Sequence, residues 1–236
     1  MKNLDIIIPI YNEGKNLKII LQKLSKKVKA NCKFYICYDK KNETGLKYIN
    51  KKNKKIFLIK NPKLGPNQAI LAGIRSGKSE NILVYMADDY HNINLINKIL
   101  FFSNKYDVIV PSRYVEGGKF QNAKFLKKLI TDTASLFINK ILRIPIKDNT
   151  NAFKFFKRKI LKKIKFKSKI GFTYAIELVI KSYFAGYKIK EIPCVWKDIS
   201  GRKSNFKIIE WLPHYSYWIY FIIIKYIKCF FSLKKK

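Results

Sequence analysis

Cysteine pairs are missing from this sequence of 236 residues. The four cysteines show neither CxxC spacing nor the density of a disulfide framework: Cys32, Cys37, Cys194 and Cys229. This pattern argues against a small disulfide-stapled domain and favours reduced thiols in a cytosolic protein. A signal peptide is missing too, because the first apolar stretch, 6–10, is short and contains Pro9. We therefore expect a cytoplasmic location.

Acidic residues and arginine are scarce. Fifteen Asp and Glu residues stand against 50 Lys and Arg, giving a net charge of +35, and only five of the basic residues are Arg. Specific readers of nucleic acid favour Arg for bidentate base contacts, and no zinc-finger, RNP or helix-turn-helix pattern is present, so we expect no nucleic-acid partner. The charge indicates either a compositional preference for Lys, Ile and Asn or attraction to an anionic surface.

No apolar run reaches the roughly 20 residues that a membrane span needs. Residues 217–224, YWIYFIII, come nearest, and Lys225 and Lys228 follow on one helical face. We expect 211–236 to form an aromatic, Lys-containing helix in the plane of an anionic membrane, at its cytosolic face. The alternative is a helix packed on the protein itself. On either interpretation, a membrane-embedded partner would be a separate chain.

Strand and helix patterns alternate along the first half of the chain. This alternation predicts an α/β fold with a mostly parallel central sheet flanked by helices. Strands are expected at 5–10, 33–38, 55–60, 81–87, 107–111, 152–156 and 187–196. Helices are expected at 14–28, 43–51, 65–77, 92–104, 119–143, 172–186 and in the tail, 205–233.

Acidic and amide side chains follow three of the expected strands. The segments DIIIPIYNE (5–13) and ILVYMADDYHN (82–92) are apolar runs that end in Asn12, Glu13, Asp88 and Asp89, and FYICYD ends in Asp39. Ligands of open α/β sheets bind outside the carboxyl ends of the strands. Because Mg²⁺ and Mn²⁺ prefer carboxylate oxygen, the pattern predicts a metal held by Asp88 and Asp89 beside a nucleoside pocket.

Six motifs in order give the sequence a resemblance to a known family. They are PxYNE after the first strand, the AD-containing loop, SRY…GG, DNTNAFK, GF…EL, and EIP followed by GRKSNF, in 5–13, 86–89, 112–118, 148–154, 171–178 and 191–206. The chain resembles the family 2 glycosyltransferases of GT-A fold. More narrowly, it is similar to polyprenyl-phosphate glycosyltransferases, the group that includes dolichyl-phosphate mannosyltransferase. The match runs from residue 5 to about 210, so 1–210 is the expected catalytic domain and 211–236 the membrane-associating helix.

The sequence departs from the family pattern at two places. Met86 stands at the first position of the usual DxD metal motif, which leaves Asp88 as its second acid and Asp89 as an extra one. After the second strand, the usual acid pair is reduced to Asp39, and two lysines follow it. The first departure concerns metal binding, and the second concerns which nucleotide base the donor carries.

The resemblance implies inverting transfer of a sugar from a GDP- or UDP-linked donor to a polyprenyl phosphate or a lipid-linked acceptor, with Mg²⁺ or Mn²⁺ as cofactor. It assigns the nucleotide sugar to Pro9, Tyr11, Asn12, Glu13, Asp39, Gln68 and Asp88. It assigns catalysis to Asp88, Arg113 and Arg202, and the acceptor phosphate to Arg113, Arg202, Lys203 and Ser204.

The acceptor decides whether a catalytic base is needed. A phosphate monoester is largely dianionic near neutral pH and needs cations rather than a base. A sugar hydroxyl, the acceptor of the alternative reading, would need one, and Asp148 and Glu177 are the candidates. A third reading, suggested by Met86, is a non-catalytic basic module that binds a membrane or nucleic acid.

Overall fold

The computed structural model describes residues 1–50, 52–123, 125–197 and 208–233. Within α6, the side chains of 208–209 and 230–233 are outside the description. The predicted site residues Arg202, Lys203 and Ser204 also lie outside the described residues.

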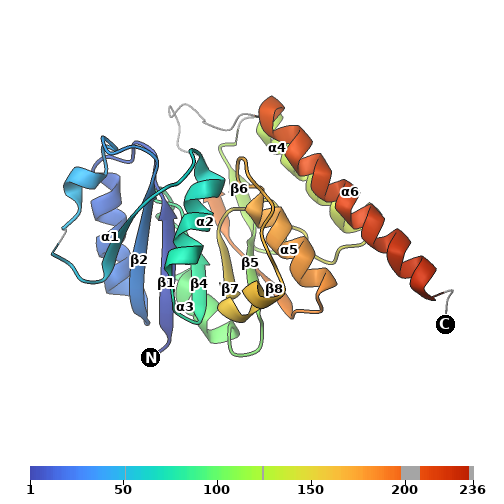
Figure 1. Ribbon diagram of the computed structural model, residues 1–236, viewed down its shortest axis with the longest axis horizontal. Helices are drawn as coiled ribbons and strands as arrows, with labels where there is room; N and C mark the ends of the chain where they lie inside the picture. The colour runs from blue at the N-terminus through green and yellow to red at the C-terminus, as the bar shows by residue number, and fades with distance from the viewer. Residues whose placement is uncertain (51, 124, 198–207, 234–236) are drawn as a thin grey trace.

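A sheet of seven strands forms the centre of the molecule, in the order β3-β2-β1-β4-β7-β5-β8 (Figure 1). The strands are β1 (Asn3–Pro9), β2 (Asn31–Tyr38), β3 (Ile56–Lys60), β4 (Asn81–Val84), β7 (Lys154–Lys157), β5 (Val108–Ser112) and β8 (Ile189–Pro193). Only β7 runs antiparallel to its neighbours among these seven. The mostly parallel sheet predicted from the apolar runs is confirmed.

Helices cover both faces of the sheet, because its central strands are buried on both sides. One core layer contains α1 (Asn16–Lys27) and α3 (Leu95–Phe102). The other contains α2 (Pro66–Ser76), α5 (Tyr174–Phe184) and part of α6 (Ile208–Leu233). The remaining helix, α4 (Phe125–Leu136), continues into a π-helical turn, η2 (Phe137–Ile141).

The tail helix α6 packs on the protein along one side. Trp211, Trp218 and Ile222 are buried, and Trp218 and Ile222 belong to the same core cluster as α5. Within the part of the chain that is described, no helix has both the length and the apolar character needed to cross a membrane.

Three expected elements were wrong in type or extent. The helix expected at 43–51 is only a 3₁₀ turn, η1 (Leu46–Tyr48), and Asn50 and Asn53 accept hydrogen bonds from backbone N–H groups two residues on, as turn residues do. The helix expected at 119–143 begins instead with a strand, β6 (Lys119–Gln121). That strand pairs with β9 (Val195–Lys197), which was not separated from β8 in the sequence.

Gly73 brings α2 directly onto the sheet. A Cβ at this position would lie 2.4 Å from Cγ2 of Ile7 and 2.7 Å from Sγ of Cys37. Both neighbours are fully buried side chains on β1 and β2, so they have little room to move. The small residue is therefore required for helix–sheet packing, and this packing positions the N-terminus of α2 beside the ends of the strands.

We predict that Gly73→Ala lowers the free energy of unfolding by about 1–3 kcal/mol, the usual cost of overpacking a core. The gain in helix propensity, about 1 kcal/mol, offsets this only in part. Denaturant titration would measure the change, with the exposed Lys18→Ala on α1 as control. An Ala variant as stable as wild type would contradict the close approach.

Candidate active site at the carboxyl ends of the strands

The predicted polar residues come together at one edge of the sheet. Strand β1 lies between β2 and β4 and is parallel to both. Asn12 and Glu13 follow β1, Asp39 follows β2, and Asp88 follows β4. The structure therefore brings these four residues to the same rim, as the sequence pattern predicted.

The loop after β1 is held by a residue that the sequence did not reveal. Glu43 is buried, and its Oε1 accepts hydrogen bonds from the backbone N–H of Glu13 at 3.1 Å and of Gly45 at 3.3 Å. Thr44 Oγ1 accepts the N–H of Gly14 at 3.2 Å. The loop itself turns through a left-handed Asn12, with φ 57°, a conformation that Asn tolerates. Tyr11, in the same loop, is 53% exposed.

Asp39 fixes the entrance to α2. Its carboxylate accepts hydrogen bonds from Asn61 Nδ2 at 2.5 Å and from the backbone N–H of Gly65 at 3.0 Å. Gly65 has φ 104°, in the region that favours glycine, and directly precedes the helix. Asp39 remains partly exposed. It therefore lies at the rim and also fixes the position of the turn that begins α2.

Asp88 and Asp89 differ in environment although they are adjacent. Asp88 is partly exposed. Asp89 is 6% exposed, and its carboxylate accepts hydrogen bonds from the backbone N–H groups of His91 and Asn92 and from Asn92 Nδ2. Burial raises the pKa of Asp89, and the hydrogen bonds oppose that rise. The structure thus places the Asp89 carboxylate inside its own loop. Met86 is a member of the hydrophobic core.

Asn92 connects this acidic loop to the small sheet. Its Nδ2 donates to the carbonyl of Val195 at 2.8 Å, and its Oδ1 accepts the N–H of Val195 at 3.2 Å. Val195 begins β9, which pairs with β6. A buried Asn with a reciprocal backbone pairing of this kind carries no local sequence signal, and sequence reasoning missed it.

Arg113 makes a buried ion pair with Asp148. Its Nε donates to Oδ2 and its Nη2 to Oδ1, each at 2.8 Å, and Nη2 also donates to Thr150 Oγ1 at 2.9 Å. The guanidinium lies 4.6 Å from the ring centroid of Phe120. Although burial alone would raise it, the pKa of Asp148 is lowered by the charge and hydrogen bonds of Arg113. Arg113 was predicted at the acceptor phosphate; the structure places it 8% exposed in this pair.

Lys154 adds a second buried cation beside the pair. It is fully buried, and its Nζ donates to the backbone carbonyls of Asp148 at 3.3 Å and Asn151 at 2.5 Å. Burial lowers the pKa of Lys154 to about 8, against the raising effect of Asp148. The segment 148–154 therefore contributes to a buried, hydrogen-bonded polar cluster beneath the rim.

The two carboxylates considered as catalytic bases are both engaged internally. Asp148 is fully buried against Arg113. Glu177 is also fully buried, and its two oxygens accept the backbone N–H groups of Lys167 at 2.6 Å and Ser168 at 2.7 Å, together with Lys181 Nζ.

The N-terminus of α2 is tied to the segment that Glu177 holds. Asn67 is buried, donates to the carbonyl of Ser168 and accepts the N–H of Tyr174. Gln68, expected at the nucleotide sugar, is more exposed and donates to the carbonyl of Lys169 at 3.0 Å. Asn67 is thus the positioning residue of this pair, and sequence reasoning had not singled it out.

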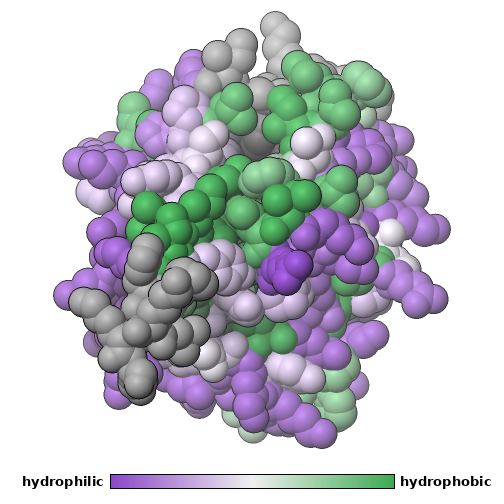
Figure 2. All heavy atoms as spheres, turned by 90° about the vertical axis from the view of Figure 1, so that its right-hand side faces the viewer, coloured by the Kyte–Doolittle hydropathy of each residue, from purple (hydrophilic) through white to green (hydrophobic). Residues whose placement is uncertain are grey.

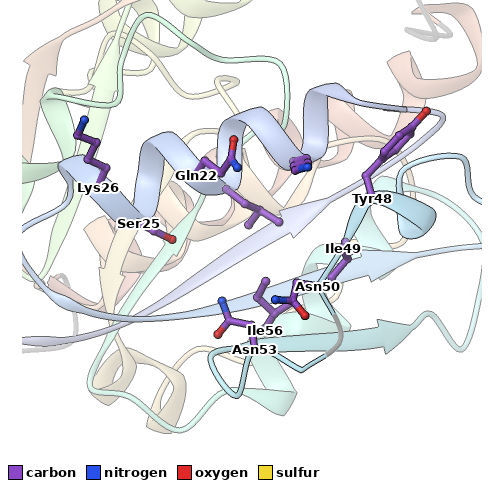
Figure 3. Close-up of a pocket in the computed structure, with 10 residues that line it drawn as sticks. Gln22, Ser25, Lys26, Tyr48, Ile49, Asn50, Asn53 and Ile56 are labelled. Atoms are coloured by element: carbon purple, nitrogen blue, oxygen red, sulfur yellow. The ribbon is translucent and has the colours of Figure 1, made fainter.

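A hollow of about 490 Å³ lies elsewhere, between α1 and the chain that leads into β3 (Figure 3). Gln22, Ser25 and Lys26 line it from the helix, and Tyr48 and Asn53 line it from the facing segment. None of the predicted site residues lines it, so we do not assign it to the rim.

The profile of the family described as glycosyl transferase family 2 matches residues 5–165. This range covers more than half of the chain and includes the three strand ends that form the rim. The chain belongs to glycosyl transferase family 2. The family predicted from the six motifs is therefore confirmed.

Two curated relatives are about 25% identical to this chain over the aligned residues. The dolichol-phosphate mannosyltransferase of Pyrococcus furiosus is 26% identical over 226 residues, covering 89% of this chain and 61% of its own length. The polyprenol monophosphomannose synthase of Mycolicibacterium smegmatis is 25% identical, covering 87% of this chain and 85% of its own. The chain thus spans less than two thirds of the first relative.

Solved structures support the GT-A fold. Glucosyl-3-phosphoglycerate synthase from Mycobacterium tuberculosis, in complex with Mn²⁺, UDP and glucosyl-3-phosphoglycerate, superposes with a TM-score of 0.67 at 8% identity, covering 89% of this chain and 75% of that one. The same protein with Mg²⁺ and UDP gives 0.66 at 8% identity, over 88% and 74%. At such identity, the likeness concerns the fold alone, and it confirms the expected fold class.

We predict that Arg113→Met destabilises the glycosyltransferase by about 3–5 kcal/mol, because it leaves the buried Asp148 carboxylate without its partner. Denaturant unfolding would measure the loss. The exposed Arg75→Met, at the end of α2, removes an equal charge and should change stability by less than about 0.5 kcal/mol. Equal effects of the two substitutions would contradict a structural role for the Arg113 pair.

A pH dependence follows from Lys154. Its folded pKa, about 8, lies below its ordinary value of 10.5. Between these pH values the unfolded chain keeps a proton that the folded chain has released, so this residue's contribution to the free energy of unfolding increases with pH. The stability of wild type relative to Lys154→Met should therefore rise from pH 8 to above pH 10. Paired urea titrations would measure it, and a flat or falling difference would contradict the burial of a titrating lysine.

Proposed function

We propose that this glycosyltransferase moves a sugar from a nucleotide-diphosphate sugar to a polyprenyl phosphate, with inversion at the anomeric carbon, at the cytosolic face of a membrane. The names of the two curated relatives, a dolichol-phosphate mannosyltransferase and a polyprenol monophosphomannose synthase, support this acceptor.

The engagement of Asp148 and Glu177 is the observation that carries the proposal. A sugar hydroxyl must lose its proton to a base during attack. Both candidate bases are fully buried and already accept several hydrogen bonds. A phosphate monoester brings its own negative charge and needs no base. A phosphate acceptor therefore fits the described part of the rim better than a sugar hydroxyl does.

The donor would lie across the ends of β1, β2 and β4. Asn12 and Glu13 follow β1 and Asp39 follows β2, where carboxylate and amide groups accept or donate hydrogen bonds to a ribose and a base. Pro9 and Tyr11 shape the same loop, and Gln68 enters from the start of α2. The GDP- and UDP-linked donors are both compatible with these groups, so the assay must include both.

The site is better suited to a divalent cation held by Asp88 alone than to one held by Asp88 and Asp89 together. Mg²⁺ in enzymes is commonly held by one or two carboxylates together with substrate phosphates and water. Asp88 is partly exposed at the rim, Asp89 is committed to Asn92, and Met86 packs in the core. We assign Asp88 as the protein ligand of the cation. Asp89, predicted as a second ligand, is reassigned to holding the loop that contains both acids. Bound there, Mg²⁺ or Mn²⁺ would stabilise charge on the departing diphosphate.

Cations at the acceptor phosphate complete the proposal. We keep Arg202, Lys203 and Ser204 for this contact, since arginine binds phosphate in a bidentate manner. Arg113 is assigned a positioning role, because its guanidinium already holds Asp148 and Thr150. The direct contact with the phosphate thus falls mainly on the segment after β9.

The proposal predicts that Asp88→Asn lowers kcat/KM by about 10²–10³, the usual cost of removing one group that stabilises charge in the transition state. The assay measures transfer of labelled sugar from a panel of GDP- and UDP-sugars to short-chain polyprenyl phosphate, with and without Mn²⁺. The lost activity should occur without lost thermal stability.

Glu116→Gln serves as the matched control, because Glu116 is an exposed acid in the chain after Arg113. It should leave transfer unchanged. Product that forms only with a glycan acceptor would overturn the phosphate acceptor. Absence of transfer with every donor and acceptor, from a folded enzyme, would overturn the activity as a whole.

A further inference from the structure

Helix α4 buries polar side chains and exposes apolar ones, the reverse of a typical surface helix in a water-soluble domain. Its buried residues are Thr131 and Ser135. Its exposed side carries large apolar side chains, which continue into η2: Phe125 81%, Leu126 56%, Leu129 49%, Leu136 61%, Phe137 38% and Ile141 65%. A surface helix normally turns its apolar stripe toward the core. This stripe faces outward instead.

Helix α6 adds a second apolar strip on the same side of the molecule. Its exposed side chains are Leu212, Tyr217, Tyr220, Ile223, Tyr226 and Ile227. Ile138 of η2 is in one core cluster with Trp218 and Ile222 of α6, and Arg143 acts electrostatically on Tyr226. Figure 1 shows both helices at the right-hand side. We call this surface, 125–141 with the exposed side of α6, the α4–α6 face.

The apolar atoms of this face form a patch rather than scattered points. Figure 2, which looks onto this side, shows hydrophobic atoms gathered in a band with hydrophilic atoms around it. Of the 19 large hydrophobic residues exposed in the described chain, six lie on 125–141 and six on α6. A contiguous exposed patch of this kind marks an interaction surface.

Cations accompany the patch. Lys128, Lys140, Arg143, Lys225 and Lys228 are exposed on or beside these two helices. Asp132, which pairs with Lys128, and Glu210 are the acids on the described parts of α4, η2 and α6. The face therefore combines apolar and positively charged groups.

We propose that the α4–α6 face docks on the surface of an anionic lipid bilayer, with both helices lying in the plane of the interface. Aromatic and aliphatic side chains suit the boundary between headgroups and acyl chains, and lysines suit anionic headgroups. A second copy of the chain fits less well, because each copy has a net charge of +35 and would bring like charges together. The inference rests on the proposed function for its biological setting, but the docking itself needs no catalysis.

The test measures flotation of the full chain with vesicles of phosphatidylcholine, with or without phosphatidylglycerol, and without polyprenyl phosphate or nucleotide sugar. Wild type should float with the anionic vesicles and much less with the neutral ones. The variant Phe125→Ser/Leu129→Ser should lose roughly tenfold in partition, since it removes apolar area from α4 alone. Phe101→Ser, which changes a 70% exposed residue on α3, should float as wild type does.

Three results would overturn the inference: undiminished flotation of the α4 variant, equal flotation with neutral vesicles, or a dimer in light scattering that the α4 variant abolishes. Transfer to a short-chain acceptor in solution separates this inference from the proposed function. The α4 variant should retain that activity. If wild type floats but transfers no sugar to a phosphate acceptor, the docking stands and the proposed function falls.

Discussion

The buried pair of Arg113 and Asp148 is the interaction on which one half of the rim depends. Asp148 accepts hydrogen bonds from the side chain and backbone of Arg113 and from the backbone of Asn151, and Glu191 on β8 accepts the backbone N–H of Asp148. The end of β5, the segment before β7 and β8 are thereby joined. Because a buried ion pair adds little net stability over apolar packing, we interpret the pair as a device that selects one conformation of these loops.

Scarcity of acids makes the use of each carboxylate informative. Glu43, Asp89 and Glu177 each accept backbone N–H groups in segments that have no ladder partner, which satisfies donors that would otherwise be costly to bury. The same role explains why a strand-end acid need not be a ligand. Once these residues are committed, Glu13, Asp39 and Asp88 are the partly exposed acids at the rim, and the chemistry of the site concentrates on them.

The sequence predicted what depends on hydrophobic pattern and missed what depends on tertiary hydrogen bonding. Apolar runs located the parallel strands, and their ends located the rim, because burial on both faces dictates such runs. Pattern could not separate Asp88 from Asp89, since the difference lies in the hydrogen bonds of Asn92. The helix expected at 43–51 gave way to a short turn because Glu43 and Thr44 bind the loop after β1. Arg113 was assigned to a phosphate from the resemblance of its motif, and its pairing with Asp148, 35 residues away, has no local sequence signal.

Composition alone allowed two explanations of the net charge of +35, a coding preference or attraction to an anionic partner. The distribution of apolar groups bears on this choice. Elsewhere in the described chain, exposed hydrophobic residues are more dispersed: Leu64 lies in the loop before α2 and Phe101 on α3, as on ordinary protein surfaces. On α4 the apolar stripe faces outward and not toward the core. Exposure of this stripe to water is unfavourable, so solvation does not explain its orientation. Lysines without an apolar patch would fit a coding preference equally well. The proposed lipid surface is anionic and apolar at once, so it accounts for both the lysines and the outward apolar stripe of α4.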